Sequence, residues 1–442
     1  MRLHTKAIAG VGALALLLTA CSPATPAEKD STDAPTEVAT VTFRLWDEVA
    51  APYYEESFEA FEAENPDINV EVELVPWAQY WEQLPLDISS GEMADIFWVN
   101  SSNFALYADN GNLINISEDL NPNHDEWQQS VVALYTRNGS LWGVPQLWDS
   151  IAMFYNVDML DEAGIDPTTL TWAPGAGEED TFLPALQQLT KDTNGNTADS
   201  ADFDPENIAT YGFNAQADLQ AIYLNFLGSN GAEFQGDDDQ FNFNTPEGIA
   251  AFQYIVDLIN THHVAPPTAE TNTNGDFSRD LFIRGELALF QSGPYNLRNI
   301  ADNTDVNWSL APMVAGPEGR VGVVHGVAAV GNAQTENLDA TLRVLEWLGS
   351  AEGQHPIAAN GVAFPGVVEA QDAFVDYWAR EGIDVSMFIT AASGNTINAP
   401  RGAMVNAGIQ EVVPHLLDMF LGNATVEDAL QAAQDAGNTA ME

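Results

Sequence analysis

The sequence predicts an α/β protein built on a doubly wound, largely parallel sheet. Three short runs of strand character, at residues 41–45, 70–74 and 96–99, are separated by two segments with helical periodicity. Alternation of this kind favours parallel strands, because each connecting helix returns the chain to the same edge of the sheet. With 442 residues, the chain is also long enough for two or more domains.

The first strand is predicted at residues 41–45, where apolar and polar residues alternate. Trp46, Asp47 and Glu48 follow at its carboxyl end, the edge at which open α/β sheets bind ligands. An exposed indole beside two carboxylates suits a sugar, whose ring has an apolar face and whose hydroxyls need acceptors. The alternative is that Trp46 belongs to the core and the two acids are solvated.

The next two strands bring further polar and aromatic residues to the same edge. After the strand at residues 70–74, Trp77 begins a helix, and Asn100 directly follows the apolar run at residues 96–99. That apolar run is typical of a buried parallel strand. Trp77 and Asn100 are therefore candidate ligand residues, although Trp77 could equally be a packing residue at a helix start.

The remainder of the chain is predicted to be richer in helix. Two extended runs, at residues 141–148 and 151–156, are separated by Asp149 and Ser150. Thr425 is predicted to cap the last helix, with Asp428 three residues later. Helices are expected at residues 182–190, 219–227, 246–260, 276–284, 337–348, 403–421 and 425–436, with extended segments at residues 287–290 and 321–330.

Composition excludes one class of function. The chain has 13 Lys and Arg against 65 Asp and Glu, a formal net charge of −52. Such a surface repels a duplex or an anionic bilayer, so we expect no nucleic-acid binding. The charge fits a salty habitat but does not identify a ligand, and nothing in the sequence indicates a cofactor.

The amino terminus has the pattern of an exported lipoprotein. Arg2 and Lys6 precede an apolar run at residues 7–18, and Cys21 is the only cysteine, so no internal disulfide can form. The residues just before Cys21 resemble a bacterial lipobox. We expect a signal peptide at residues 1–20, a lipid on Cys21 and a flexible tether to residue 40. The alternative is an ordinary signal peptide that happens to contain a cysteine.

A possible metal loop is rejected on its spacing. Asp and Asn alternate at residues 192–196, as at the start of an EF-hand calcium loop. However, Thr197 stands where glycine is needed and Phe203 occupies the twelfth position instead of Glu. An Asx-rich turn is therefore favoured, and no metal site is predicted.

Taken in order along the chain, these segments resemble the extracellular solute-binding proteins of carbohydrate ABC importers, the group that includes maltose-binding protein. No single motif is specific, and the resemblance rests on their order over nearly the whole of residues 41–442. The matching segments are the lipobox at Cys21 and residues 41–46, 58–74, 91–97, 143–156, 282–295 and 323–330.

The resemblance implies a two-lobed fold of the periplasmic-binding-protein type, with a doubly wound sheet and flanking helices in each lobe. Three crossings would join the lobes, near residues 146–151, 324–327 and 366–374. The expected boundaries are residues 41–147 plus 327–370 for lobe one, and 148–326 plus 371–442 for lobe two.

The resemblance also implies further ligand residues. Tyr295 follows Ser292, Gly293 and Pro294, where relatives place an aromatic ring that stacks on sugar. The alternatives are a structural role for His325 and a structural ion pair for Arg401. The candidates at the crossings and in a late loop are Trp148, Asp149, His325, Asn398 and Arg401.

The function that the resemblance implies is capture of a sugar or oligosaccharide for an ABC importer, without catalysis. The expected partners are a carbohydrate, permease subunits and, through the lipid anchor, the outer face of the cytoplasmic membrane, which faces the periplasm where a cell has one. We expect a monomer. Two other functions remain open: a secreted glycoside hydrolase, since carboxylates beside aromatic rings also suit that chemistry, and a receptor for a non-sugar solute such as a peptide or polyamine.

Overall fold

The computed structural model describes residues 38–442 apart from residues 176, 178 and 237. The predicted signal peptide, Cys21 and most of the predicted tether therefore lie outside the described residues. The first strand, β1 (Ala39–Leu45), begins two residues earlier than expected. Within the described part of the chain, no helix has the length and apolar character needed to cross a membrane.

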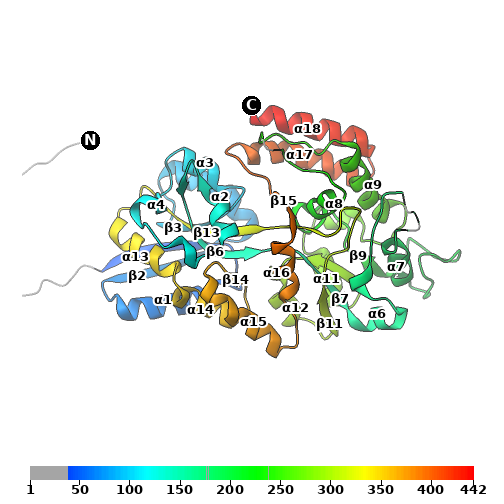
Figure 1. The fold of residues 1–442 in the computed structure, drawn as a ribbon, viewed down its shortest axis with the longest axis horizontal. Helices are drawn as coiled ribbons and strands as arrows, with labels where there is room; N and C mark the ends of the chain where they lie inside the picture. The colour runs from blue at the N-terminus through cyan, green and yellow to red at the C-terminus, as the bar shows by residue number, and fades with distance from the viewer. Residues whose placement is uncertain (1–37, 176, 178, 237) are drawn as a thin grey trace, which may run out of the picture. The chain divides into compact units, whose positions relative to one another are not determined.

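A six-stranded sheet contains the predicted βαβαβ unit, with strand order β14-β6-β13-β3-β1-β2 (Figure 1). β1 runs parallel to both β2 and β3, whereas β13 runs antiparallel to both β3 and β6. Val41, Phe43 and Leu45, the alternate residues of β1, are fully buried, as the apolar pattern predicts. The other strands of this sheet are β2 (Ile68–Leu74), β3 (Ile96–Asn100), β6 (Val144–Asp149), β13 (His325–Gly331) and β14 (Phe364–Pro365).

A second, five-stranded sheet has the order β11-β7-β10-β9-β8. β7 is antiparallel to both β10 and β11, and β9 is parallel to β10, so this sheet is mixed. Three of its strands, β8, β9 and β11, were not predicted. The strands are β7 (Ala152–Asn156), β8 (Lys191–Asp192), β9 (Ile208–Phe213), β10 (Leu287–Ser292) and β11 (Trp308–Ala311).

Helices surround both sheets, and most of those predicted are present. In Figure 1, α17 and α18 lie side by side near the carboxyl terminus, and both pack against α9. Thr425 accepts a hydrogen bond from the Asp428 backbone N–H at 3.2 Å, which confirms the predicted cap of α18. The longer helices are α1 (Ala51–Glu64), α2 (Trp77–Ser90), α7 (Phe182–Leu189), α9 (Pro246–Asn260), α13 (Leu338–Leu348), α14 (Ala351–Ala359), α15 (Gln371–Arg380), α16 (Ser386–Ser393), α17 (Val405–Phe420) and α18 (Val426–Met441).

Shorter elements fill the connections. The first group comprises α3 (Phe104–Asp109), α4 (Ile116–Asp119), η1 (His124–Glu126), α5 (Gln129–Leu134), β4 (Thr136–Arg137), β5 (Ser140–Leu141), α6 (Val157–Ala163) and η2 (Pro167–Thr169). The second comprises η3 (Leu219–Tyr223), α8 (Leu224–Ser229), α10 (Thr268–Thr271), α11 (Phe277–Ile283), η4 (Pro294–Asn296), α12 (Leu297–Ala301), β12 (Val321–Val323), η5 (Val368–Ala370) and β15 (Asn395–Ile397).

The chain passes between the two sheets at several points. β6 leads into β7 through only two residues, Ser150 and Ile151. β12, which pairs with β15 in a separate two-stranded sheet, leads into β13 through the single residue Val324. Beyond β14, α15 packs against α14 and β14, while α16 packs against β7, β12 and β15. The exact lobe boundaries remain a prediction.

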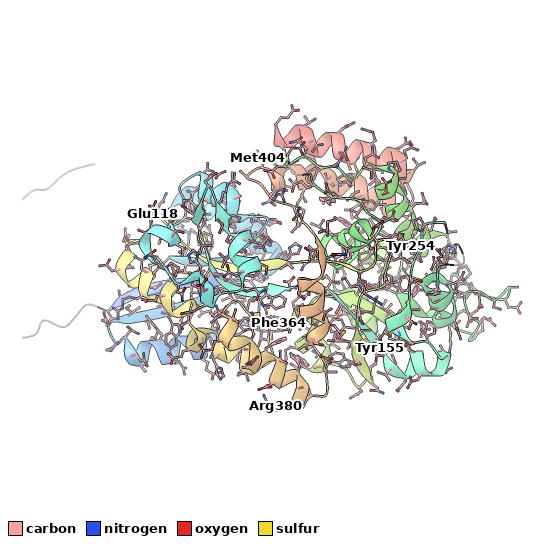
Figure 2. The ribbon with its side chains drawn as sticks, in the orientation of Figure 1. Glu118, Tyr155, Tyr254, Phe364, Arg380 and Met404 are labelled. Atoms are coloured by element: carbon pink, nitrogen blue, oxygen red, sulfur yellow. The ribbon has the colours of Figure 1, made fainter. Side chains whose placement is uncertain are left out.

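Aromatic rings connect the cores of the two sheets. Trp148 on β6 stacks on Phe364 with ring centroids 4.6 Å apart, and Phe364 lies 6.3 Å from Phe388 of α16. Phe388 in turn lies 6.2 Å from Phe154 on β7. We call these four residues the aromatic bridge; Phe364, labelled in Figure 2, lies at its middle. One continuous apolar cluster therefore includes residues from both sheets.

Candidate functional site

Aromatic side chains gather at the carboxyl end of β1. The Trp46 ring centroid lies 5.3 Å from Trp77, 5.1 Å from Tyr80, 5.2 Å from Trp81 and 5.1 Å from Trp98. We call these five residues the aromatic group. Trp98 is fully buried, Trp46 is partly buried and Trp77 is 53% exposed. Exposure to solvent therefore increases across the aromatic group, from Trp98 in the core to Trp77 at the surface.

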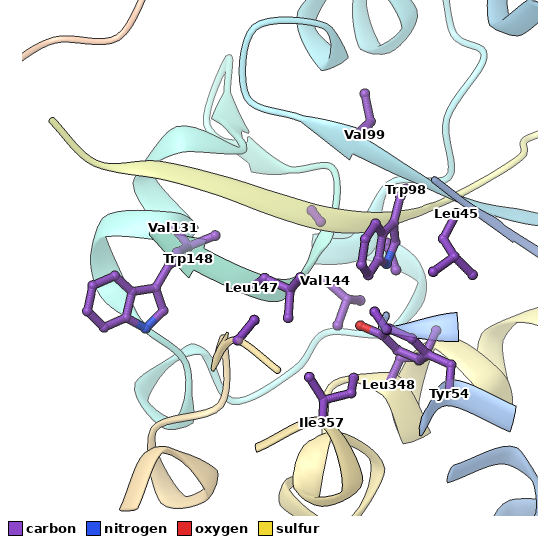
Figure 3. Packing of buried hydrophobic residues seen from close by; sticks show 14 of the residues in the cluster. Leu45, Tyr54, Trp98, Val99, Val131, Val144, Leu147, Trp148, Leu348 and Ile357 are labelled. Atoms are coloured by element: carbon purple, nitrogen blue, oxygen red, sulfur yellow. The ribbon is translucent and has the colours of Figure 1, made fainter. Parts of the chain in front are cut away.

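Trp46 belongs partly to the core. A core position was the alternative to a ligand contact that the sequence left open for this residue. Beneath it, Trp98 lies 5.4 Å from Tyr54 of α1, and Figure 3 shows these two rings facing each other within the packed cluster. The Tyr54 hydroxyl donates to Gln146 at 3.0 Å, and the Tyr80 hydroxyl donates to the Trp98 carbonyl at 2.6 Å. The second bond links two members of the aromatic group, and the first fixes Tyr54, on which Trp98 packs.

The two acids after Trp46 differ in their surroundings. Asp47 Oδ1 accepts hydrogen bonds from the backbone N–H groups of Val49 at 2.8 Å and Ala50 at 3.1 Å. It therefore orders the start of α1, and burial raises the pKa of its carboxyl. Glu48 is exposed to solvent. Asp47 thus has a structural role that the sequence did not indicate.

Asn100, at the end of β3, lies in a segment that contacts a distant part of the chain. Its side-chain oxygen accepts a hydrogen bond from Asn103 at 2.7 Å. Nearby, Ser102 donates to the Pro400 carbonyl at 3.2 Å, and Asn406 donates to Asn103. The carboxyl edge of the first sheet therefore touches the segment leading into α17, which contains Met404 of Figure 2.

Trp148 lies near the end of β6, at the expected crossing to β7, but its side chain is buried. Its side chain is 2% exposed and stacks on Phe364 within the aromatic bridge, and Figure 3 shows it apart from Trp98, at the far end of the packed cluster. In this structure the Trp148 ring is therefore part of the core, and its contact with a ligand remains a prediction. The physical reason is that β14, more than 200 residues later in the chain, supplies an apolar partner that covers the indole.

Asp149 and His325 lie together where β6 and β13 pair. Asp149 accepts a hydrogen bond from the Gln220 side chain, and burial raises the pKa of its carboxyl to about 7. Burial also lowers the pKa of His325 to about 4, and its Nε2 atom is buried without a hydrogen-bond partner. Near neutral pH, His325 is therefore uncharged, with an unpaired polar atom.

Tyr295 presents a partly open ring beside these residues. It is 39% exposed and follows β10 through Gly293 and Pro294. A Cβ atom at Gly293 would lie only 2.2 Å from the Tyr295 ring, so the ring position requires glycine there. Burial, followed by the charges of Asp218 and Asp149, raises the pKa of the Tyr295 phenol.

Three polar residues in this region were not identified from the sequence: Asp218, Gln220 and Gln291. Asp218 caps η3, since its Oδ1 atom accepts from the Ala221 N–H at 2.8 Å. Gln291 is 1% exposed in β10, and its amide nitrogen donates to the Ala221 carbonyl at 2.6 Å. Two signals were available: an Asp just before a predicted helix, and a Gln in a strand that is otherwise buried and apolar.

The late-loop candidates follow β15. Asn398 is exposed. Arg401 forms an ion pair with Asp239 at 3.3 Å, and its backbone N–H donates to Gln235 at 2.7 Å. Of the two roles considered for Arg401, the ion pair is the one this structure contains.

The loop at residues 192–196 is an Asx-rich turn. The carboxylate of Asp192 accepts hydrogen bonds from the backbone N–H groups of Asn194, Asn196 and Asp204 and from the Asn196 amide. Although burial opposes ionisation, these donors lower the pKa of Asp192 to about 2. Across the described ranges of the chain, no cluster of three or more His, Cys, Asp or Glu side chains is arranged to hold a metal ion.

Two surface hollows lie away from the candidate site. One, of about 530 Å³, is lined by α14 and α15 residues, including His355 and Arg380. The other, of about 250 Å³, is lined by residues that include Tyr211 and His263. Neither hollow is lined by a predicted site residue.

Comparison with known proteins identifies related sequences over most of the chain. The family model described as "bacterial extracellular solute-binding protein" matches residues 46–355. A maltooligosaccharide ABC transporter solute-binding lipoprotein of Streptococcus pneumoniae is 24% identical over 443 residues, covering 98% of this chain and 96% of the relative. An arabinooligosaccharide-binding protein of Bacillus subtilis is 23% identical over 352 residues, covering 77% of this chain and 75% of the relative.

Solved structures share the fold. The crystal structure of UspC from M. tuberculosis is 45% identical, covers 91% of this chain and 100% of its own, and superposes with a TM-score of 0.74. A substrate-binding protein from Listeria monocytogenes in complex with cycloalternan is 18% identical, with 91% and 99% coverage and a TM-score of 0.78. The fold is thus two-lobed, as predicted.

Proposed function

Since the chain belongs to the bacterial extracellular solute-binding proteins, we propose that it captures a carbohydrate between its two lobes for an ABC importer. The observation that carries the proposal is the pair of open aromatic rings, Trp77 at 53% and Tyr295 at 39% exposure. Aromatic faces with nearby polar groups suit sugar rings. The relatives named for maltooligosaccharides and arabinooligosaccharides support the same ligand class.

In this proposal, Trp46, Trp77 and Tyr295 supply ring faces. Asp149 and His325 supply polar groups at the crossing between the sheets. Asn100, Glu48, Asn398 and Arg401 are proposed to flank the site, whereas Asp47 acts through the start of α1. A ligand touching both lobes stabilises the arrangement in which the lobes close on it. Its delivery to permease subunits then needs no chemical change in the ligand, so the protein is a receptor without turnover.

The proposal extends to the surroundings of the protein. A lipid on Cys21 would hold a monomer on the outer face of the cytoplasmic membrane, with the following residues as a tether. The lipoprotein named among the relatives supports this placement. Mass spectrometry of the protein purified from membranes tests it: a diacylglyceryl mass on Cys21 is expected, and an unmodified thiol contradicts it.

A thermal-shift screen against mono- and oligosaccharides tests the ligand class, because a ligand of the folded state raises the melting temperature. We expect a shift with at least one sugar and no product by chromatography. Shifts only with peptides or with amines that lack a sugar ring would exclude a carbohydrate ligand. Hydrolysis of a bound oligosaccharide would exclude a pure receptor.

Replacing Tyr295 tests the site itself. Tyr295→Ala removes a stacking ring and is expected to weaken sugar binding by at least about tenfold, with little change in melting temperature. Tyr295→Phe is the matched control, because it keeps the ring face and loses only the hydroxyl. Equal affinity of Tyr295→Ala and wild type in calorimetric titration would show that the site lies elsewhere.

A further inference from the structure

We propose that Asn406 is a positioning residue for the sugar: through Asn103 it orients the side-chain amide of Asn100, so that closing the two lobes prepares a hydrogen-bond donor for the ligand. The inference rests on the proposed function and goes beyond it. It assigns Asn103 and Asn406 a role in affinity that involves no contact with the sugar. We call the three asparagines the amide relay.

The amide relay crosses between two apolar clusters. Asn103 lies in the chain between Val99 and Phe104, which are buried in the cluster that includes β1 and β3. Asn406 is the second residue of α17, and its neighbour Val405 is buried in the other cluster. The Asn406 side-chain N–H donates to Asn103 Oδ1. This bond therefore requires the segment after β3 and the start of α17 to come together, and Figure 1 shows α3 and α17 on the same side of β6 and β13.

The relay has one direction from end to end. Asn103 accepts from Asn406 with its Oδ1 atom, and its Nδ2 atom donates to Asn100 Oδ1 at 2.7 Å. The backbone N–H of Asn103 also donates to the Asn100 carbonyl at 3.1 Å, which closes the turn between these two residues. Asn103 and Asn100 thus both accept with their side-chain oxygens, so the orientation of the Asn100 amide follows from that of Asn103.

Asn103 occupies the capping position of α3 without capping the helix. An asparagine at this position ordinarily accepts a hydrogen bond from a backbone N–H in the first turn. Among the described residues, none in the first turn of α3 donates to the Asn103 side chain. That side chain bonds to Asn406 and Asn100 instead. The relay therefore replaces a local helix contact with one that depends on the approach of α17.

The relay leaves the side-chain nitrogen of Asn100 available to a ligand. Within the described part of the chain, this nitrogen has no hydrogen-bond partner. Asn100 and Trp98 lie two residues apart on β3 and therefore share one face of the sheet. Trp98 is a buried member of the aromatic group, so Asn100 lies on the side of the sheet that carries these rings. An amide nitrogen there donates to a hydroxyl or ring oxygen of a sugar.

A second hydrogen bond joins the same two segments without entering the relay. The Ser102 hydroxyl donates to the Pro400 carbonyl at 3.2 Å. Removing this bond weakens the approach of the two segments but leaves the bonds of Asn103 in place. Ser102→Ala is therefore the matched control for a role in closure alone.

The test measures sugar affinity by isothermal titration calorimetry on the full folded protein at pH 7. The probe is whichever of glucose, galactose, glucosamine, N-acetylglucosamine, maltotriose and arabinotriose gives the largest thermal shift. Asn103→Asp still accepts from Asn406, but it presents a second oxygen to Asn100, whose amide must then turn and offer its oxygen to the sugar. Affinity is expected to fall by at least about tenfold, with little change in melting temperature.

A double-mutant cycle shows whether the loss passes through Asn100. In an Asn100→Ala background, Asn103→Asp is expected to change affinity by less than about twofold. Ser102→Ala is expected to weaken binding by about two- to fivefold in both backgrounds, because it acts on closure alone. Asn406→Asp reverses the relay from its other end. It is expected to repeat the loss seen with Asn103→Asp, and it answers the same question if Asn103→Asp folds poorly.

The outcomes separate this inference from the proposed function. Wild-type affinity in both Asn103→Asp and Asn406→Asp would overturn the inference and leave the carbohydrate receptor intact. An equal loss with and without the Asn100 side chain would also overturn it, since the effect would then be one of closure or stability. If the wild-type protein binds none of the six sugars, the proposed function fails and the inference fails with it.

Discussion

Two titratable side chains at the same crossing respond to pH in opposite directions. Asp149 and His325 pair across β6 and β13, and burial disfavours the charged form of each. The folded state therefore holds a proton on Asp149 up to about pH 7 and keeps His325 neutral down to about pH 4. Between pH 4 and pH 7 the two residues change the stability in opposite directions, and their effects partly cancel. Near neutral pH, Asp149 is the main contributor of the two to the pH dependence of stability.

Asp149→Asn is expected to remove the contribution of Asp149 to the pH dependence of stability. Because the folded-state pKa of Asp149 is raised to about 7, its stabilising effect is complete below its unfolded pKa near 4 and is lost as the pH rises to 7. The free energy of unfolding of the variant should therefore equal that of wild type at pH 4. At pH 8 it should be higher by a few kcal/mol at most, since each unit of pKa shift corresponds to about 1.4 kcal/mol. Urea unfolding at several pH values measures the difference.

Asp192→Asn provides the comparison of opposite sign. Backbone and side-chain donors lower the pKa of Asp192 to about 2, so its stabilisation is present above pH 4 and is lost as the pH falls toward 2. This variant should be less stable than wild type at pH 7. A parallel response of the two variants to pH would contradict the charge assignments.

A single glycine determines the ring position of Tyr295. Gly293→Ala places a Cβ atom 2.2 Å from the ring, so the ring must turn away. We expect sugar affinity to fall by about two- to tenfold, the range of a lost aromatic contact, with the fold retained. Gly275→Ala is the control, since a Cβ atom there meets nothing within 4 Å. Calorimetry with both variants checks the result, and unchanged affinity in Gly293→Ala would contradict a stacking role for Tyr295.

Elements with strong local signals formed where the sequence placed them. α9 is predicted over residues 246–260 and observed over the same residues, with Pro246 in its first turn and Thr245 as its cap. β8 and β11 were not predicted because they have only two and four residues, whereas the six residues of β9 show no regular alternation of buried and exposed positions and depend on pairing with β8 and β10. Local pattern thus predicted most of the longer helices and the buried strands, whereas α14, α15 and α16 were not predicted and the short strands depended on the assembled sheet.

The contribution of the α9 cap to stability can be measured by substitution. The Thr245 hydroxyl accepts from the Gly248 N–H at 3.1 Å. Thr245→Ala leaves that donor without its partner and should lower the free energy of unfolding by about 1 kcal/mol. Thr245→Ser keeps the hydroxyl and should unfold within about 0.5 kcal/mol of wild type in urea. Equal stability of all three proteins would show that the cap contributes nothing.

Over the whole molecule, the order of segments along the chain predicted the two-lobed architecture through its resemblance to a known family. Trp46 and Trp77 were proposed as ligand residues because they follow predicted strands, and strand ends share an edge. Asp218 and Gln291 were not identified because their positions depend on η3 lying against β10, a contact that no local pattern contains. The burial of Trp148 was not foreseen for the same reason, since its partner Phe364 comes from a distant strand.

The aromatic bridge has a consequence for how the two lobes can be separated. Trp148, Phe364, Phe388 and Phe154 join the two cores through ring contacts, and all four are at most 2% exposed. Cutting the chain between β6 and β7 would leave Trp148 on one fragment and Phe154, Phe364 and Phe388 on the other, so each fragment would expose apolar surface that the whole protein buries. Because the chain returns to the first sheet in β13 and β14, the six-stranded sheet would be divided between the two fragments, and no single cut separates the two cores.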